Sequence, residues 1–351
     1  MRRRETRFSG ADGVRWRAIA AVLAIALLSL TVRAQTAGQT AAGRTVRTAA
    51  GAAIDVLPVH GQVHLLASAG GNAAVQVGPQ GVLVVDTMTE ALADPLLQAI
   101  ATLADGKPIR YVVNTHAHPD HTGGNAKIAA AGSQLVAGNF LGQLGAAGAR
   151  SAFIVAHENV LNALSAPKAG EPALPFAAWP TDTFFQDRKD MYFNGEAVQL
   201  IHVPGAHTDG DSLVFFRSSD VICAGDVYVT TSYPRIDLAR GGHVNGIIEA
   251  LNQLVDLVVS EQFTEGGTQV IPGHGRISDE LDVVEYRDMM TIVRDRVQDM
   301  VKRGLSLDQV TAARPTLDWD TRYGSDRGAW TTALFVEAVF RNVASTSTAS
   351  R

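Results

Sequence analysis

The first half of the chain alternates short apolar runs with turn-forming residues. Several of these runs are rich in β-branched residues and bounded by Gly, Pro, Asp or Asn, which predicts strands at residues 63–66, 73–77, 82–86 and 109–113. The Gly-Pro-Gln-Gly turn at residues 78–81 indicates that the second and third of them form a hairpin. Helical spacing predicts a helix at residues 90–103 and a shorter one at 125–131, with a brief strand at 134–137.

The second half repeats this mixture of strands and helices. We expect strands at residues 197–203, 212–216 and 220–224, and helices at 245–259, 279–303 and 327–343. Ser306 and Gln309 have the spacing of a capping box and predict the start of another helix. Strands followed by a mixture of strands and helices occur in both halves of the chain. This order favours an α/β fold in which two sheets pack face to face with helices outside.

The segment from residue 139 to 195 differs from its surroundings. It has scattered Pro, Gly and Ala, helical spacing near residues 153–164, and aromatic side chains that the pattern places at the surface, namely Phe176, Trp179, Phe184 and Phe185. We interpret it as an insertion over the functional site rather than as part of the framework.

The amino terminus has the pattern of an export signal. Four arginines within the first seven residues precede an apolar run at residues 18–30, and Val32-Arg33-Ala34 has the form of a cleavage site. The run is shorter than the ~20 residues that span a bilayer, so we expect cleavage of residues 1–34 rather than a stable membrane anchor. We expect residues 35–53 to form a flexible linker. We expect the mature protein to be periplasmic or secreted, through general or twin-arginine export.

Composition and charge narrow the possible partners. With 46% hydrophobic and 19% charged residues, the chain is globular rather than disordered. Residues 1–34 hold seven arginines and two acidic side chains, so 23 of the 30 basic and 33 of the 35 acidic side chains remain after cleavage, a net charge of −10. Such a surface argues against nucleic acid and favours a small-molecule substrate. The single cysteine, Cys223, lies in an apolar run and reads as a buried thiol.

Candidate chemistry is concentrated just after the predicted strand at 109–113. His116, His118, Asp120 and His121 occur within six residues, and alternation in an extended turn sends His116 and His118 to one side and the other two past the bend. This geometry suggests two adjacent ions, and zinc readily accepts imidazole nitrogen and carboxylate oxygen. Beside glycines at three other predicted strand ends lie His207, Asp226 and His274.

This set of motifs resembles that of the metallo-β-lactamase-fold hydrolase superfamily over about residues 54–278. The resemblance implies an αββα sandwich, here with C-terminal helices at 279–345. It also implies that His116, His118 and His207 bind a first zinc ion, that Asp120, His121 and His274 bind a second, and that Asp226 bridges them. With Asp226 in place of a cysteine, the ligand set is similar to that of glyoxalase II and lactonases. The segment 240–246 and the C-terminal helices look like those of exported members associated with sulfur oxidation, for which the resemblance indicates no substrate.

The expected activity follows from this ligand set. We expect a dinuclear zinc hydrolase in which a metal-bound hydroxide, oriented by Asp120, attacks the carbonyl of a thioester, lactone, ester or cyclic amide such as a β-lactam. Two alternatives stay open: a mononuclear iron persulfide dioxygenase of the same fold, and a periplasmic binding or relay protein without catalysis. Five side chains are candidates for substrate contact, the first two as oxyanion donors: Tyr228, Tyr233, His157, His243 and Trp179.

Overall fold

The computed structural model describes residues 43–47, 53–134, 151–168 and 174–349. The predicted signal peptide lies outside these residues, and so does the expected strand at 134–137 except for Gln134, which is not in a strand. Residues 44–47, expected to belong to a flexible linker, instead form a strand that pairs with the next one. Among the helices of the described residues, none has the length and apolar character needed to cross a bilayer.

The first sheet has eight strands in sequence order, so each strand pairs with its neighbour along the chain. The pairs from β1 to β5 are antiparallel, and those from β5 to β8 are parallel. The strands are β1 (Arg44–Arg47), β2 (Ala53–His60), β3 (Val63–Ser68), β4 (Gly71–Gly78), β5 (Gly81–Val85), β6 (Ile109–Val113), β7 (Phe153–His157) and β8 (Asp182–Phe184). Between β5 and β6 the crossover that a parallel pair requires contains α2 (Ala93–Ala104).

The second sheet has five strands in the order β13-β12-β11-β10-β9. They are β9 (Arg188–Phe193), β10 (Glu196–His202), β11 (Ser212–Phe216), β12 (Val221–Gly225) and β13 (Gln269–Pro272). Only the β12–β13 pair is parallel, and its crossover contains α7 (Val244–Leu257).

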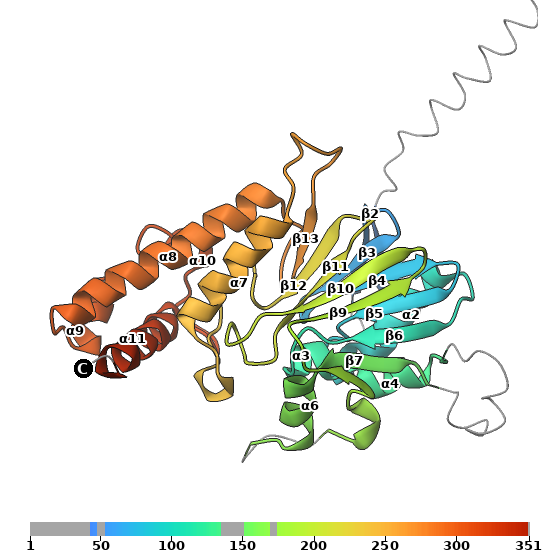
Figure 1. Cartoon of the computed structure of the whole chain (residues 1–351), viewed down its shortest axis with the longest axis horizontal. Coiled ribbons are helices and arrows are strands. Elements are labelled where there is room, and N and C mark those ends of the chain that lie inside the picture. The colour runs from blue at the N-terminus through green and yellow to red at the C-terminus, as the bar shows by residue number, and fades with distance from the viewer. Residues whose placement is uncertain (1–42, 48–52, 135–150, 169–173, 350–351) are drawn as a thin grey trace, which may run out of the picture. The chain divides into compact units, whose positions relative to one another are not determined.

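The two sheets pack face to face, with helices on both outer faces, as Figure 1 shows. Helix α2 and the short α4 (Asn125–Ala130) cover the first sheet, while α7 and α8 (Glu280–Lys302) cover the second. The expected αββα sandwich with C-terminal helices is therefore present.

Strand β5 shows how alternation builds these layers. All five of its residues are buried, because both faces of the sheet are covered. Val82 and Val84 pack outward against α2, whereas Leu83 and Val85 point the opposite way into the space between the sheets.

The interpretation of residues 139–195 as an insertion is wrong for most of the part that is described. Residues 153–157, expected to be helical, form β7, which pairs in parallel with β6 and has a buried apolar centre. The helix α6 (Glu158–Ser165) begins only afterwards, and β8 and β9 are also framework strands. Phe184, expected at the surface, is buried between the sheets, while Phe176 and Phe185 are exposed. A strand buried on both faces gives a continuous apolar run, which periodicity does not distinguish from a buried helix.

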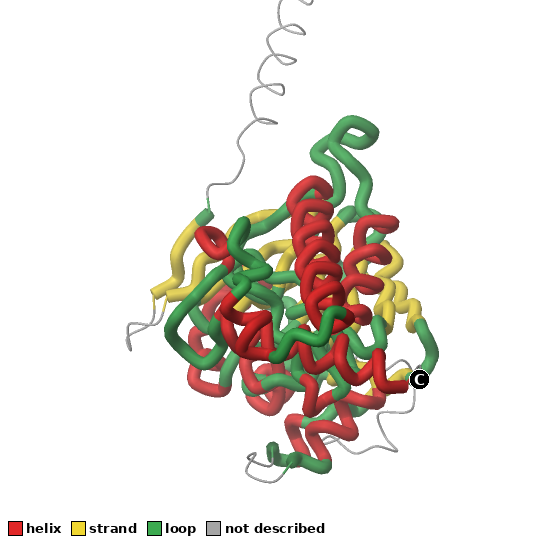
Figure 2. The backbone as a smooth tube through the Cα atoms, turned by 90° about the vertical axis from the view of Figure 1, so that its left-hand side faces the viewer, coloured by secondary structure: helices red, strands yellow, loops and turns green. Residues whose placement is uncertain are grey.

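The C-terminal helices form a layer of their own on the second sheet. The capping box of Ser306 and Gln309 is present at the start of α9 (Leu307–Ala312), and α11 (Thr332–Ala349) packs Phe335 and Val339 into the same core as α7 and α8. Figure 2 shows this helical layer in front of the strands.

Candidate metal centre

The seven predicted metal ligands come together at one edge of the sandwich. His116, His118, Asp120 and His121 follow β6, and the loop is closed at its base because Asn125 donates to Asn114 at 2.8 Å. Pro119 opens the short helix α3 (Pro119–Thr122), where its missing N–H costs nothing. His207, Asp226 and His274 follow β10, β12 and β13. Gly225 allows the close approach, since it has a φ of 52° and a Cβ there would lie 2.7 Å from Oγ1 of Thr115.

The first cluster contains His116, His118, His207 and Asp226, whose ligand atoms all lie within 4.8 Å of one another. Oδ2 of Asp226 lies 3.7 Å from Nε2 of His207 and 4.0 Å from Nε2 of His116. Nδ1 of His118 lies 2.8 Å from Nε2 of His207. Three imidazole nitrogens and one carboxylate oxygen therefore converge on one point.

The second cluster contains Asp120, His121, His274 and again Asp226. Oδ1 of Asp226 lies 3.3 Å from Nε2 of His121 and 3.5 Å from Nε2 of His274. Nε2 of His274 is also 3.3 Å from Oδ2 of Asp120. The two oxygens of Asp226 thus face different clusters, which is the arrangement that a bridging carboxylate requires.

Unpaired buried atoms show that these clusters fit metal ions. Nε2 of His116, Nε2 of His121 and Oδ1 of Asp226 are buried, and none has a hydrogen-bond partner among the described residues. Buried polar atoms are almost always paired, and leaving one unpaired costs about 1–3 kcal/mol. All three atoms point into the clusters, so cations between these ligands would satisfy them.

Hydrogen bonds behind the ligands orient the imidazole rings. Asp86 accepts from Nδ1 of His121 at 2.8 Å, and the backbone carbonyl of Arg235 accepts from Nδ1 of His207 at 2.5 Å, so both rings direct Nε2 at a cluster. His118 is reversed: its Nε2 lies 2.9 Å from Asp237, and its Nδ1 faces the cluster. Such partners select the tautomer that can bind metal.

Sequence reasoning missed Asp86 and Asp237. Asp86 could have been found, because it is a carboxylate at the end of a predicted strand, as Asp226 is. Asp237 had no such signal, since it lies in an irregular loop and meets His118 across 119 residues of sequence.

The pKa values of four ligands match their roles, whereas the neighbouring carboxylates outweigh burial and raise the pKa of His121 and His274. Burial lowers the pKa of His116 well below its usual value and that of His207 to about 4, so both stay neutral, the form that binds metal. Burial alone would raise the pKa of Asp226, but the neighbouring His121, His116 and His207 outweigh it and hold this pKa well below its usual value. For Asp120, the contact with His274 similarly overcomes burial and lowers the pKa to about 2.

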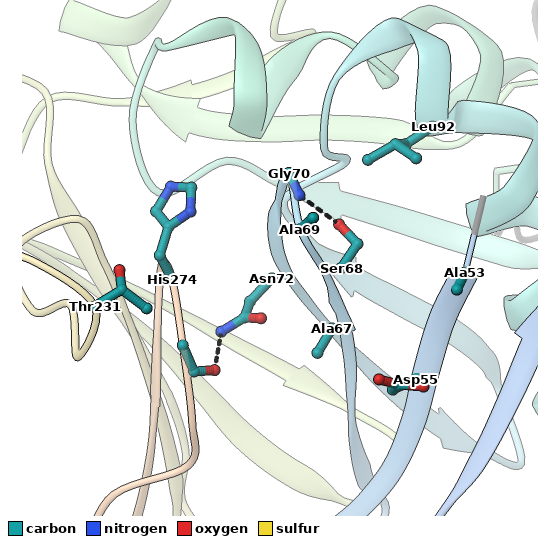
Figure 3. Close-up of a pocket in the computed structure, with 11 residues that line it drawn as sticks. Ala53, Asp55, Ala67, Ser68, Ala69, Gly70, Asn72, Leu92, Thr231 and His274 are labelled. Atoms are coloured by element: carbon teal, nitrogen blue, oxygen red, sulfur yellow. Dashed lines mark hydrogen bonds between the residues drawn. The ribbon is translucent and has the colours of Figure 1, made fainter. Parts of the chain in front are cut away.

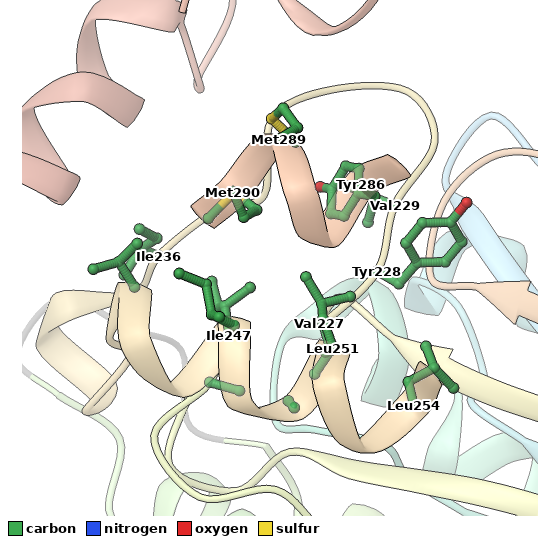
Figure 4. Packing of buried hydrophobic residues seen from close by; sticks show 14 of the residues in the cluster. Val227, Tyr228, Val229, Ile236, Ile247, Leu251, Leu254, Tyr286, Met289 and Met290 are labelled. Carbon is green, nitrogen blue, oxygen red and sulfur yellow. The ribbon is translucent and has the colours of Figure 1, made fainter. Parts of the chain in front are cut away.

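The expectation that Tyr228 and Tyr233 donate to an oxyanion is wrong. Both side chains are 1% exposed and belong to the core under the C-terminal helices, where Figure 4 shows Tyr228 beside Tyr286 of α8. The hydroxyl of Tyr228 donates to Ser278 at 2.9 Å, and that of Tyr233 bonds to Thr316 and Asp320 at 3.0 Å. These hydroxyls hold the core together and do not face the clusters.

The other three candidates for substrate contact also have structural roles. His157 is buried, stacks on His202 with ring centroids 3.7 Å apart, and accepts from the backbone of Asn159 at the start of α6. His243 caps α7 through Asn245 in the same way. Trp179 donates to the carbonyl of Leu174 and packs against the cluster formed by Ala117, Ala156, Val160 and Leu164.

Two cavities adjoin the metal ligands. A cavity of about 960 Å³ lies beside His274 and is bordered by Ser68, Gly70, Asn72 and Thr231, as Figure 3 shows. A smaller one of about 260 Å³ lies beside His118 and Asp120 and is bordered by residues of α6 and by two arginines. The ligand clusters are therefore approached from two sides with different linings.

Comparison with known proteins gives consistent results. Residues 69–274 match the metallo-beta-lactamase superfamily. The chain is 25% identical over 258 residues to a linear primary-alkylsulfatase from a Pseudomonas strain, covering 66% of this chain and 47% of that protein. It is 23% identical over 230 residues to a hydroxyacylglutathione hydrolase from Methylococcus capsulatus, covering 64% of this chain and 72% of that protein.

Solved structures show the same fold. A stereoselective inverting sec-alkylsulfatase from Pseudomonas sp. superposes with a TM-score of 0.58 at 15% identity, covering 82% of this chain and 49% of that one. The chain thus spans about half the length of the alkylsulfatases that it matches. With the family match over more than half of its length, the two-sheet sandwich and the His/Asp clusters at its edge, the chain belongs to the metallo-beta-lactamase superfamily.

Proposed function

We propose that this chain is a dinuclear zinc-dependent hydrolase that cleaves a carbonyl substrate such as a thioester, lactone, ester or cyclic amide. The observation that carries the proposal is Asp226, whose Oδ2 faces one set of three ligands and whose Oδ1 faces another. A single-ion site would need no carboxylate shared in this way.

The donor set favours zinc. It consists of imidazole nitrogens and carboxylate oxygens, which zinc accepts at catalytic sites that keep a position open for water. Cys223, which could have supplied a thiolate, is buried between the sheets, and burial raises the pKa of its thiol well above the usual value.

Two metal ions held by these residues would supply a water of lowered pKa and would polarise the substrate oxygen. The chain's own residues determine where the reaction occurs. The side chain of Asp120 is 36% exposed and that of His274 26%, whereas His116 and His207 are fully buried, so substrate approaches from the side of the second cluster. Asp120 is charged and lies at this opening, where its carboxylate can orient the attacking water.

The test combines metal analysis with a substrate panel. Zinc-loaded wild type should contain close to two zinc ions per chain and should hydrolyse at least one thioester, lactone or β-lactam in a chelator-sensitive manner, while Asp120→Asn should lose most of this activity. If both proteins hold two ions and behave alike on every substrate, carbonyl hydrolysis is excluded. One tightly held iron after aerobic purification would favour the persulfide dioxygenase alternative, and metal binding without any turnover would favour a binding or relay protein.

A second candidate is hydrolysis of sulfate esters. It is favoured by the alkylsulfatase relative and by Arg235 in the wall of the smaller cavity, which would suit a sulfate group. Release of inorganic sulfate from an alkyl sulfate by the zinc-loaded protein, and its loss in Asp120→Asn, would distinguish this reaction from carbonyl hydrolysis.

We also propose that the protein is exported, since residues 1–34 have the pattern of a signal peptide. Mass spectrometry of protein from its native host should find an N-terminus at Gln35 in the periplasmic fraction. An intact Met1 on native protein would contradict export with cleavage.

A further inference from the structure

The lining of the smaller cavity beside the metal ligands combines apolar and cationic side chains. It is about 260 Å³ in volume and contacts His118 and Asp120 directly. Its lining includes the apolar Leu164 and Leu174 and the cationic Arg235 and Arg240. A ligand that carries both an apolar group and a negative charge would match this lining, beside the metal ligands His118 and Asp120.

Arg235 offers a positive charge on a fixed backbone. Its carbonyl accepts the 2.5 Å hydrogen bond from His207, and its neighbours Pro234 and Ile236 are buried. The Arg235 side chain is exposed, and its guanidinium has no hydrogen bond or ion pair with any residue that the structure describes. The guanidinium is therefore available to an anionic ligand, which its planar donors would bind in two-point fashion.

Arg240 has a different role. Its Nη1 lies 3.3 Å from Oδ2 of Asp237, the same oxygen that lies 2.9 Å from Nε2 of His118. The charge of Arg240 is thus already directed at the carboxylate that orients a metal ligand. Of the two arginines in the wall, Arg235 is the one that can recognise substrate.

The apolar part of the lining suits a small group. Leu164 is only 7% exposed and packs with Ala117 and Ala156, while Ala163 and Leu174 pack against the same cluster. The cavity volume falls just below the ~300–1,000 Å³ typical of pockets for drug-sized ligands. A short aliphatic group fits this space.

The larger cavity lacks this combination. None of the described residues that line it is a lysine or arginine, and it includes the carboxylate of Asp55. An anionic end of a substrate would therefore be repelled from that side and directed to Arg235.

We propose that the smaller cavity binds the acyl part of the substrate, a short aliphatic group that ends in a carboxylate, with Arg235 as the residue that determines specificity for the charge. The leaving group then lies in the larger cavity beside His274. This inference rests on the proposed hydrolysis at the adjacent clusters, and it adds the substrate class.

The test compares a charged and a neutral acyl group of similar length on zinc-loaded protein. We would measure kcat/KM for the p-nitrophenyl monoester of succinate and for p-nitrophenyl valerate with wild type, Arg235→Gln and Arg235→Lys. The matched control is Arg303→Gln, an exposed arginine that follows the last residue of α8 and pairs with Asp299. We expect Arg235→Gln to lower kcat/KM for the succinate ester about 10- to 100-fold, because one charge-assisted contact is lost. The change should come mainly from a higher KM. The valerate ester should be unaffected, and Arg235→Lys should recover part of the loss.

Three outcomes overturn the proposal: no change with either ester, an equal loss with both, or no preference of wild type for the charged ester. If wild type cleaves neither ester, the proposed carbonyl hydrolysis is in doubt, and the role of Arg235 is then tested by ligand binding. Calorimetric titration of zinc-loaded protein with succinate should then show weaker binding to Arg235→Gln than to wild type by a similar factor. Equal affinities would refute a role for Arg235 independently of activity.

Discussion

Replacing Asp86 by asparagine tests whether the hydrogen bonds behind the ligands prepare the second cluster for metal. Asp86 is 3% exposed, and its carboxylate accepts three hydrogen bonds: Oδ1 from the backbone N–H of Thr115 at 2.8 Å, and Oδ2 from Oγ1 of Thr115 at 2.7 Å and from Nδ1 of His121 at 2.8 Å. Asparagine keeps the shape of the side chain but replaces one acceptor oxygen by an NH₂ donor.

Each orientation of the new amide has a cost. If its oxygen takes the Oδ2 position, the NH₂ group faces the backbone N–H of Thr115 and leaves this donor unpaired, which costs about 1–3 kcal/mol of folding free energy. If its oxygen takes the Oδ1 position, the NH₂ group faces Nδ1 of His121 and favours the tautomer with the proton on Nε2, the atom that faces Asp226. That tautomer must be abandoned before metal binds, so a similar free energy is lost from metal affinity.

At about 1.4 kcal/mol per factor of ten, 1–3 kcal/mol corresponds to roughly 5- to 150-fold weaker binding at the second cluster. This range includes the ~10- to 100-fold loss typical for partners of metal ligands. The assay is a zinc competition titration with a chromophoric chelator, together with urea unfolding of the metal-free protein. Asp94→Asn, which alters an exposed carboxylate paired with Lys127, is the control. Unchanged zinc affinity and unchanged unfolding free energy in Asp86→Asn would refute the reasoning.

Three further predictions concern other parts of the fold. Asp226→Ala should lower the zinc content of both clusters in elemental analysis, whereas Cys223→Ala should retain two ions and full activity; loss of metal from the cysteine variant would show that the ligands are wrongly assigned. Tyr228→Phe removes the hydrogen bond to Ser278 and should lower the free energy of urea unfolding by about 0.5–1.5 kcal/mol with kcat unchanged. A fall in kcat would instead support a catalytic role for Tyr228. Burial lowers the pKa of His157 from its usual 6.5 to about 4, so between these pH values the unfolded chain binds a proton that the folded one does not, and stability falls as the pH falls. In urea unfolding of the metal-free protein, the free energy of unfolding should fall less between pH 7 and pH 4.5 in His157→Phe than in wild type. An equal fall in both proteins would contradict this prediction.

The sequence by itself determined the features that depend on residues near one another in the chain. Because successive side chains of a strand point to opposite faces, Leu83 and Val85 share one face and Val82 and Val84 the other, whatever the rest of the protein does. The capping box at Ser306 is likewise local. The seven ligand candidates could be proposed because their residue types, next to strand ends and glycines, have few other uses.

Only the tertiary structure decided which of the remaining polar residues take part in the site. His118 meets Asp237 across 119 residues, and Tyr233 meets Thr316 across 83, so no local pattern distinguishes a partner of a metal ligand from a residue of the core. The same holds for residues 153–157, whose apolar run becomes a strand because β6 and β8 lie on either side of it. The position of Arg235 at the cavity wall also depends on such a long-range contact, since its backbone is held by His207. Local spacing determines which residues share a face of an element, but the packing of elements that are distant in sequence determines what that face contacts.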